Sequence, residues 1–554
     1  MSVRPPGLRN PMRTAPFLLG AALLGAALFG PAPPRRAPQV EILALITVGM
    51  DADLRWPDLA DVQPDLRRLY AGRDWAPFWF RDDTLVSSAR MVIRTLQEAE
   101  VRGLDPGDYD AGWLAGQAET SDTAMVGRID VALSVAAARF ALALRHGRVS
   151  PAAADSGFRL PVDSFDLAGT LKTLATSEFP DDLLQGLEPP FPQYWQLIAA
   201  LSRYRQLALN YALLPLPPMP ALLRPGDTYA GVNALRHLLW VLGDYRDSLP
   251  LPYLDSHYTG PVVTAVQLFQ LRQGFTPDGV IGPLTRSRLN RPFEPRIRQI
   301  ELALERWRWM PRVFAVPPVI VNIPAFRLYA FRTTDLDETT MLAMNVVVGT
   351  AFRTETPVFA ARLEYLIFSP YWEVPTSIAL AEILPEARKD PEFLARNRYE
   401  LADSGTRVPP WPENIRRIGD GISVLQTPGP HNALGLVKFI LPNDYYIYLH
   451  DTPSKSLFER TRRDASHGCI RVADAFALTR FLLRDQPEWT DERVLAAMNA
   501  GAPMKVLLTT PVPIIIAYAT AEAHSDGELF FYSDVYGHDE GLDQLLRRGY
   551  PYPR

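Results

Sequence analysis

The chain has 554 residues, of which 47% are hydrophobic and 21% are charged, so it can bury several cores and is not an intrinsically disordered protein. Its formal net charge of −5 argues against broad electrostatic binding to nucleic acids, which requires basic surfaces. The single cysteine, Cys469, excludes a disulfide within the chain and any zinc site with two or more cysteine ligands.

The first 36 residues have the pattern of an export signal. Arg4, Arg9 and Arg13 precede an apolar run at residues 15–30 (APFLLGAALLGAALFG). This run is short for a membrane-spanning helix, which needs about 17–25 residues. No clear cleavage site follows, so the segment predicts either a signal peptide or a membrane anchor, with a buried N-terminal helix as the alternative. We expect the rest of the chain to lie outside the cytoplasm.

Residues 41–225 predict a mostly helical domain. The Ala- and Leu-rich segment 130–145 favours a helix, with Asp130 near its start and Gly147 just past its end. A Pro-rich linker at 214–225 (LPLPPMPALLRP) closes this region.

Residues 228–292 predict a small bundle of three short helices. Val262, Val266 and Phe269 stand at i, i+4 and i+7, on one face of a helix. A turn at 276–279 (TPDG) follows, and Gly282-Pro283 opens another helix with proline at its first position. The bundle is either a binding module or a structural spacer.

From residue 293 to 510 the pattern favours strands, at 316–331, 344–348, 361–368 and 437–441. Residues 376–430 interrupt them with helical, charged sequence and a Pro/Trp loop, which predicts a helical or loop-like lid inserted in a β-rich domain. Residues 511–554 are mixed and polar, and we expect them to form a C-terminal extension. The predicted fold class is a multi-domain α+β protein.

Cys469 lies in the sequence SHGCIR at 466–471, and fifteen residues separate His450 from Ser466. A nucleophilic cysteine needs a base within hydrogen-bond reach and donors for the developing oxyanion. A histidine at the end of the β-like run 445–449 and a cysteine on a glycine-opened turn can supply both. The alternative is a buried, inert cysteine. The histidines show no metal-binding pattern, so we expect neither a metal site nor a cofactor.

The His450 and SHGCIR spacing resembles the signature of the L,D-transpeptidase (YkuD-like) catalytic domain. The surrounding sequence also resembles the large, multi-domain type of this family, at IELALERWRWMP (300–311), VNIPAFRLY (321–329), PYWEVP (370–375), PGPHNALGLVKF (428–439) and HDTP (450–453). Residues 262–285 resemble a peptidoglycan-binding three-helix domain, and the N-terminal helical region resembles the scaffold domain of that type.

The resemblance implies a role for each motif residue. Cys469 is the nucleophile, His450 the base, and Gly468 an oxyanion donor together with the Cys469 amide. Ser466 and His467 shape the turn and help to polarise the substrate carbonyl. The other implied substrate contacts are Arg471, which would hold a carboxylate, and Tyr371 and Trp372, for which structural packing is the alternative. The backbone carbonyl of Asp451 is a candidate for orienting the base; a role for its side chain as a triad acid is less favoured.

The implied reaction is acyl transfer in the periplasm. The cysteine attacks a tetrapeptide stem between diaminopimelate and D-Ala, and a diaminopimelate amine of a second stem resolves the thioester into a 3–3 cross-link. Implied partners are these stems, carbapenem inhibitors and a D,D-carboxypeptidase or other wall-synthesis protein, with no nucleic acid. The alternatives are an L,D-carboxypeptidase, a D-amino-acid exchange enzyme and a non-catalytic wall-binding scaffold. A papain-like protease is disfavoured because His450 precedes Cys469.

Overall fold

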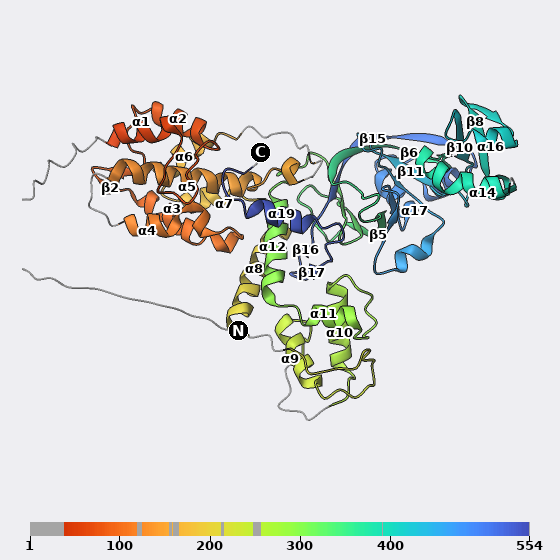
Figure 1. Ribbon diagram of the computed structural model, residues 1–554, viewed down its shortest axis with the longest axis horizontal. Helices are drawn as coiled ribbons and strands as arrows, with labels where there is room; N and C mark the ends of the chain where they lie inside the picture. Colours follow the sequence, from red (N-terminus) through yellow and green to blue (C-terminus); the bar gives the residue numbers. More distant parts are fainter. Residues whose placement is uncertain are drawn as a thin grey trace, which may run out of the picture.

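The computed structural model describes residues 38–118, 125–154, 158, 165–211, 215–247, 256–390 and 392–552. The predicted export segment at 1–36 lies outside these residues. Across the described ranges, no helix is long and apolar enough to cross a membrane. Figure 1 shows a helical domain and a β-rich domain at opposite ends of the molecule, with a helix pair between them and a separate helical bundle beside that pair. The predicted multi-domain α+β class is confirmed.

The N-terminal helical domain is built around α5 (Val126–His146), whose residues are mostly buried. The predicted helix begins earlier than expected, so Asp130 lies one turn inside it and is fully buried. Its carboxylate accepts hydrogen bonds from the Phe78 and Trp79 amides. Around α5 stand α1 (Pro38–Val48), α2 (Gln63–Ala71), α3 (Ser87–Gln97), α4 (Ala111–Gln117), α6 (Leu167–Thr176) and α7 (Pro180–Gln185), the short helices η1 (Ala99–Arg102), η2 (Pro106–Tyr109) and η4 (Pro151–Ala154), and a hairpin of β1 (Phe80–Arg81) and β2 (Thr84–Leu85).

Two long helices, α8 (Pro192–Asn210) and α12 (Phe293–Trp307), pack together at the centre of the molecule (Figure 1). Between them in sequence lies the predicted bundle, with α9 (Val232–Leu242), α10 (Pro261–Arg272) and α11 (Pro283–Leu289). Val262, Val266 and Phe269 are buried, as their spacing predicts. The bundle shares one hydrophobic core with α8, α12 and the hairpin of β16 (Ala521–Ala523) and β17 (Leu529–Phe531).

The β-rich domain contains a sheet that closes on itself. Its strand order is β13-β5-β14-β12-β11-β6-β15-β3-β4, and pairing of β4 with β5 closes the barrel. A core of strand residues fills it, as the apolar alternation predicts. The strands are β3 (Val319–Asn322), β4 (Arg327–Ala330), β5 (Leu342–Gly349), β6 (Phe359–Phe368), β11 (Val437–Ile440), β12 (Leu449–His450), β13 (Asp464–Ser466), β14 (Ile470–Val472) and β15 (Met504–Ala517); the accompanying helices are η6 (Lys455–Glu459), α17 (Ala475–Leu482) and α18 (Asp491–Met498).

The boundary expected at residue 510 falls inside β15. This strand pairs with β6 and, in parallel, with β3, so the sheet continues to Ala517. This part of the strand contains Pro511 and Pro513. The register with β6 shifts between Leu507 and Val512, and such an irregularity accommodates proline in a strand. The segment that follows forms the β16–β17 hairpin and α19 (His538–Leu546), which packs against α12.

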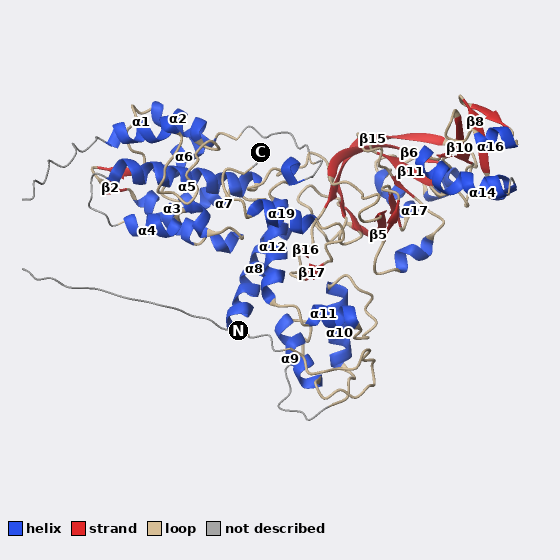
Figure 2. Cartoon of the chain, viewed as in Figure 1, coloured by secondary structure: helices blue, strands red, loops and turns tan. Residues whose placement is uncertain are grey.

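The insertion at 376–430 is a small mixed subdomain, which corrects the prediction of a helical or loop-like lid. It carries a four-stranded sheet of order β7-β10-β8-β9, seen at the far end of the β-rich domain in Figure 2. The strands β8 and β9 carry Glu400, Asp403 and Arg407 among apolar residues and so resemble the charged helical sequence around them; the sheet covers a separate hydrophobic core. The elements are β7 (Trp372–Glu373), α13 (Thr376–Ile378), the π-helix η5 (Ala379–Ile383), α14 (Leu384–Lys389), α15 (Glu392–Arg396), β8 (Tyr399–Asp403), β9 (Thr406–Val408), α16 (Pro412–Arg416) and β10 (Ile422–Gln426).

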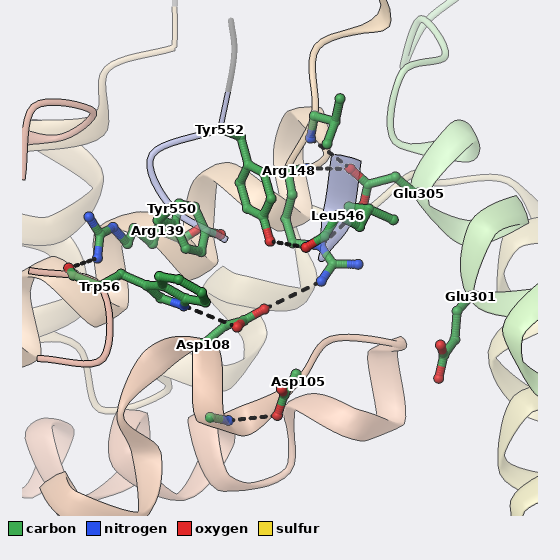
Figure 3. Close-up of polar contacts among 12 residues, drawn as sticks. Trp56, Asp105, Asp108, Arg139, Arg148, Glu301, Glu305, Leu546, Tyr550 and Tyr552 are labelled. Atoms are coloured by element: carbon green, nitrogen blue, oxygen red, sulfur yellow. Dashed lines mark hydrogen bonds and ion pairs between the residues drawn. The ribbon is translucent and has the colours of Figure 1, made fainter. Parts of the chain in front are cut away.

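A buried polar junction joins the N-terminal domain to α12 and to the segment after α19 (Figure 3). The Arg148 guanidinium lies 3.5 Å from Asp108 and 3.6 Å from Glu305, and Glu305 also accepts a hydrogen bond from the Val149 amide. Tyr550 stacks under the guanidinium of Arg139 at 4.8 Å. These contacts fix the helical domain relative to the domain that carries the cysteine.

Candidate active site

The strand register brings three polar side chains into one row across the sheet. Two of them were predicted as site residues and the third was not. His450, in β12, pairs with Arg471 in β14 on one side and with Lys438 in β11 on the other. Paired residues of neighbouring strands point to the same face of a sheet. The imidazole therefore lies between two cationic side chains. Lys438 was not predicted as a site residue, because only the register places it beside His450.

The cysteine lies on a tight turn between β13 and β14. Ser466 is buried, and its hydroxyl donates a hydrogen bond to the Cys469 carbonyl at 2.6 Å. Gly468 has a φ of +110°, a conformation that favours glycine, and an added Cβ would lie 3.3 Å from Ile447. The Thr356 hydroxyl donates to the Gly468 carbonyl at 2.7 Å and so holds the turn from the neighbouring loop.

The Gly468 amide has a different role from the one expected. It donates a hydrogen bond to the Ser466 hydroxyl at 3.2 Å and is not presented to a substrate in this structure. The serine at the start of the turn satisfies this nearby backbone donor locally, as serine side chains commonly do in turns. The sequence suggested two backbone amides as hydrogen-bond donors to an oxyanion. Of these two, the Cys469 amide is the one left for that role.

His450 is buried, and its Nδ1 hydrogen-bonds to the backbone carbonyl of Asp451. A carbonyl can only accept, so Nδ1 carries the proton and Nε2 is free to act as a base. The Asp451 carboxylate faces elsewhere: it accepts from the Lys455 ammonium at 2.7 Å and from the Leu436 amide at 3.0 Å. Asp451 therefore orients the imidazole through its backbone.

The electrostatics of the site favour neutral groups. Burial is the main cause that lowers the pKa of His450 to about 3; the charges of Arg471 and Lys438 act in the same direction, and the Asp451 carbonyl opposes them. Burial raises the pKa of the Cys469 thiol, partly offset by hydrogen bonds from Tyr448 and by the same two cations. At neutral pH the pair is a thiol beside a neutral imidazole.

Tyr448 is a second site residue that the sequence did not single out. It precedes Leu449, which pairs with Ile470, so Tyr448 lies next to Cys469 across the two strands. Burial and the nearby thiolate raise the pKa of its hydroxyl, which keeps it a donor. The run 445–449, expected to be β-like, is a strand only from Leu449 onward. Asn443 accepts from the Tyr445 and Ile447 amides and holds a turn there, and Tyr446 adopts a φ of +58°.

His467 points away from the other motif residues and toward the insertion. Its Nε2 lies 2.8 Å from the Glu382 carboxylate of η5. Tyr371 and Trp372, predicted to line the donor site, have their contacts in the insertion. Tyr371 lies under the Arg407 guanidinium at 5.0 Å, and Trp372 packs against the insertion's core. These contacts favour the packing alternative for both.

An apolar cavity of about 100 Å³ lies elsewhere, where α12 meets β3, β4 and the segment after β15. Its lining includes Trp307, Met310 and Tyr518 together with the Glu338–His524 pair, whose charged atoms are 3.3 Å apart. None of the SHGCIR residues lines it, so it is separate from the cysteine site.

Comparison with known proteins identifies two parts of the chain. Residues 64–201 match a family model described as a scaffold domain, and residues 318–514 match the L,D-transpeptidase catalytic domain. The chain carries an L,D-transpeptidase catalytic domain. That domain holds His450, Cys469 and the inserted subdomain, and the resemblance to the catalytic and scaffold domains is confirmed.

Two individual proteins are similar to parts of this chain. A protein of Haemophilus influenzae that bears the name L,D-transpeptidase is 31% identical over 228 residues, which are 41% of this chain and 45% of that protein. A crystal structure of an L,D-transpeptidase from Xylanimonas cellulosilytica, aligned over 54% of this chain and all of its own, is 17% identical with a TM-score of 0.17. The chain thus aligns with less than half of the length of its curated relative.

Proposed function

We propose that the protein is a cysteine-dependent peptidoglycan L,D-transpeptidase that forms 3–3 cross-links between stem peptides. The observation that carries this proposal is Cys469 on a glycine turn that leads into β14, the strand whose pairing with β12 places His450 opposite Arg471, and the Nδ1 of His450 is held by the Asp451 carbonyl. The L,D-transpeptidase domain supplies the reaction class.

The first half-reaction acylates the cysteine. Nε2 of His450 takes the thiol proton as sulfur attacks the carbonyl between diaminopimelate and D-Ala. The Cys469 amide stabilises the oxyanion, with the Tyr448 hydroxyl as a second donor near the sulfur. When the intermediate collapses, the amide C–N bond breaks, the imidazolium returns its proton to the leaving amine, and D-Ala departs. A thioester remains on Cys469.

The second half-reaction transfers the acyl group. The side-chain amine of a diaminopimelate on a neighbouring stem attacks the thioester, the C–S bond breaks, and sulfur recovers a proton through His450. Arg471 holds a carboxylate of the donor. The inserted subdomain reaches the turn through Glu382 and excludes water while the thioester exists. Carbapenems acylate the same cysteine.

The remaining parts of the chain are consistent with a function at the cell wall. The export segment would place the enzyme in the periplasm, either released or held at the inner membrane. The three-helix bundle would bind glycan, and a D,D-carboxypeptidase would supply tetrapeptide donors. The same site with water as acceptor would be an L,D-carboxypeptidase, and with a free D-amino acid an exchange enzyme.

The decisive experiment incubates disaccharide-tetrapeptide muropeptides with the exported part of the chain and with its Cys469→Ala variant, followed by mass spectrometry. A Cys469-dependent dimer that has lost one D-Ala supports transpeptidation. A tripeptide monomer alone favours the carboxypeptidase. No reaction, with binding to sacculi retained, favours a non-catalytic wall-binding scaffold.

A further inference from the structure

The row across β14, β12 and β11 places a cation on each side of the catalytic imidazole. Arg471 pairs with His450 from one side and Lys438 from the other. Both charges act on the thiol as well, because each lowers the pKa of Cys469 against the effect of burial. The sulfur and the imidazole therefore lie in an electropositive environment.

Neither cation is neutralised by a neighbouring carboxylate. Among the described residues Lys438 forms no ion pair; its ammonium lies over the Tyr448 ring at 5.4 Å, and the acid that acts on it electrostatically is Glu373 of β7. Nε of Arg471 is buried and has no hydrogen-bond partner within the described part of the chain. Burial lowers the pKa of both side chains, which reflects the cost of keeping them charged without counter-ions.

Other lysines of the same domain show the usual arrangement. Lys455 contacts the Asp451 carboxylate and Lys389 contacts Glu386, each at 2.7 Å. Lys505 lies over the Tyr365 ring at 3.8 Å, as Lys438 lies over Tyr448, but Lys505 is exposed to solvent. Lys438 differs from these lysines because it is partly buried, forms no ion pair among the described residues and lies beside His450.

We propose that Lys438 is a specificity-determining residue that binds a carboxylate of the donor stem, as the counterpart of Arg471 on the other side of His450. This inference rests on the proposed function. A stem that ends in diaminopimelate–D-Ala carries two carboxylates around the amide to be cleaved. One belongs to the diaminopimelate and the other to the D-Ala. The two cations that flank the imidazole match the two carboxylates of this stem. A stem in which one carboxylate is amidated leaves one desolvated cation without a partner.

A first experiment tests the anion preference without any peptidoglycan. The rates of Cys469 alkylation by iodoacetate and by iodoacetamide are measured, and their ratio is compared with the same ratio for free cysteine. Both reagents react with the thiolate, so the ratio cancels changes in thiol ionisation. We expect wild type to favour iodoacetate, Lys438→Met to reduce the ratio by about tenfold, and Lys438→Arg to retain it.

The matched control is Lys505→Met, which removes the same charge from β15, two strands away from Lys438 in the same row, with Ile367 of β6 between them. Its ratio should stay within about twofold of wild type, because exposed charges are screened over such separations. If Lys438→Met does not fold, judged by circular dichroism, Lys438→Gln takes its place. An unchanged ratio in the folded Lys438 variant, or an equal loss in Lys505→Met, overturns the proposal.

A second experiment identifies the carboxylate. D-Ala release is followed for the tetrapeptide stem, for the stem with an amidated D-Ala terminus and for the stem with an amidated diaminopimelate. Lys438→Met should raise KM for the dianionic stem by about tenfold or more, with a smaller effect on kcat, and should leave KM unchanged for one of the two amides. An equal effect on all three stems overturns the proposal.

The two experiments separate this inference from the function on which it rests. If wild type releases D-Ala from none of the stems, the proposed function fails, and the alkylation ratio still decides whether an anion site exists beside Cys469. If turnover is normal and the ratio does not respond to Lys438, the function stands and the inference fails.

Discussion

His467 Nε2 lies 2.8 Å from the Glu382 carboxylate, so the turn that carries the nucleophile is joined to the inserted subdomain by one side-chain contact. Both side chains are about half exposed. The contact links the regions of two distinct hydrophobic cores, and we expect this latch to open without disrupting either one.

Opening this latch should change the fate of the thioester. In Glu382→Ala we expect the ratio of tripeptide hydrolysis product to cross-linked dimer to rise by roughly two- to fivefold, since an exposed contact of this kind contributes about 0.5–1 kcal/mol. The products are quantified by mass spectrometry. Glu386→Ala is the control, because Glu386 lies in the same subdomain and pairs with Lys389. An unchanged product ratio would show that the contact does not exclude water.

The loop beside the nucleophile turn should matter through one hydroxyl. Thr356 donates to the Gly468 carbonyl at 2.7 Å and accepts from the Gly349 amide at 2.9 Å. Thr356→Val removes both bonds at nearly constant volume, and we expect D-Ala release to slow by about tenfold or more. Thr356→Ser keeps the hydroxyl and should recover most of the rate. Equal rates in the two variants would contradict a positioning role.

The neutral resting state predicts a distinctive pH profile. The pKa of His450 is lowered to about 3, so the base form already dominates at pH 5 and no inflection is expected near 6.5, the ordinary histidine value. The pKa of Cys469 is raised, so alkylation by iodoacetamide should climb with pH through an inflection above about 8.5. A plateau reached below pH 7 would instead indicate a preformed thiolate–imidazolium pair.

The junction of Figure 3 predicts a large effect on stability. Arg148 is buried between Asp108 and Glu305, and Arg148→Met removes one cation from each carboxylate, which leaves Asp108 with Arg55 and Glu305 with Arg308. Removing one partner of a buried pair costs about 3–5 kcal/mol. We expect a lower unfolding midpoint and faster proteolysis between the two domains, and Arg148→Met combined with Glu305→Met should cost less than the sum of the single changes. Additive losses would mean that the two side chains are not coupled.

The motif residues stand out in the sequence more clearly than the side chains that surround them in the structure. His450 and Cys469 stand in a long motif, and strand periodicity located most of the barrel. Lys438 and Tyr448 join the site only through the pairing of β11, β12 and β14, and a short strand such as Leu449–His450 offers no periodicity from which to derive that register. Glu382 reaches the site through the packing of a separate subdomain, which no local pattern encodes.

Tyr550 hydrogen-bonds to the Arg139 carbonyl at 3.4 Å across 411 residues of sequence. Closing a flexible loop of that length costs about 5 kcal/mol of chain entropy. The cost falls when the intervening segments are already compact. We therefore expect the helical domain and the barrel to fold first as separate units and the segment after α19 to dock onto the helical domain last. The contact between Tyr550 and Arg139 should thus form late in folding. We expect it to be the first contact that is lost on mild destabilisation.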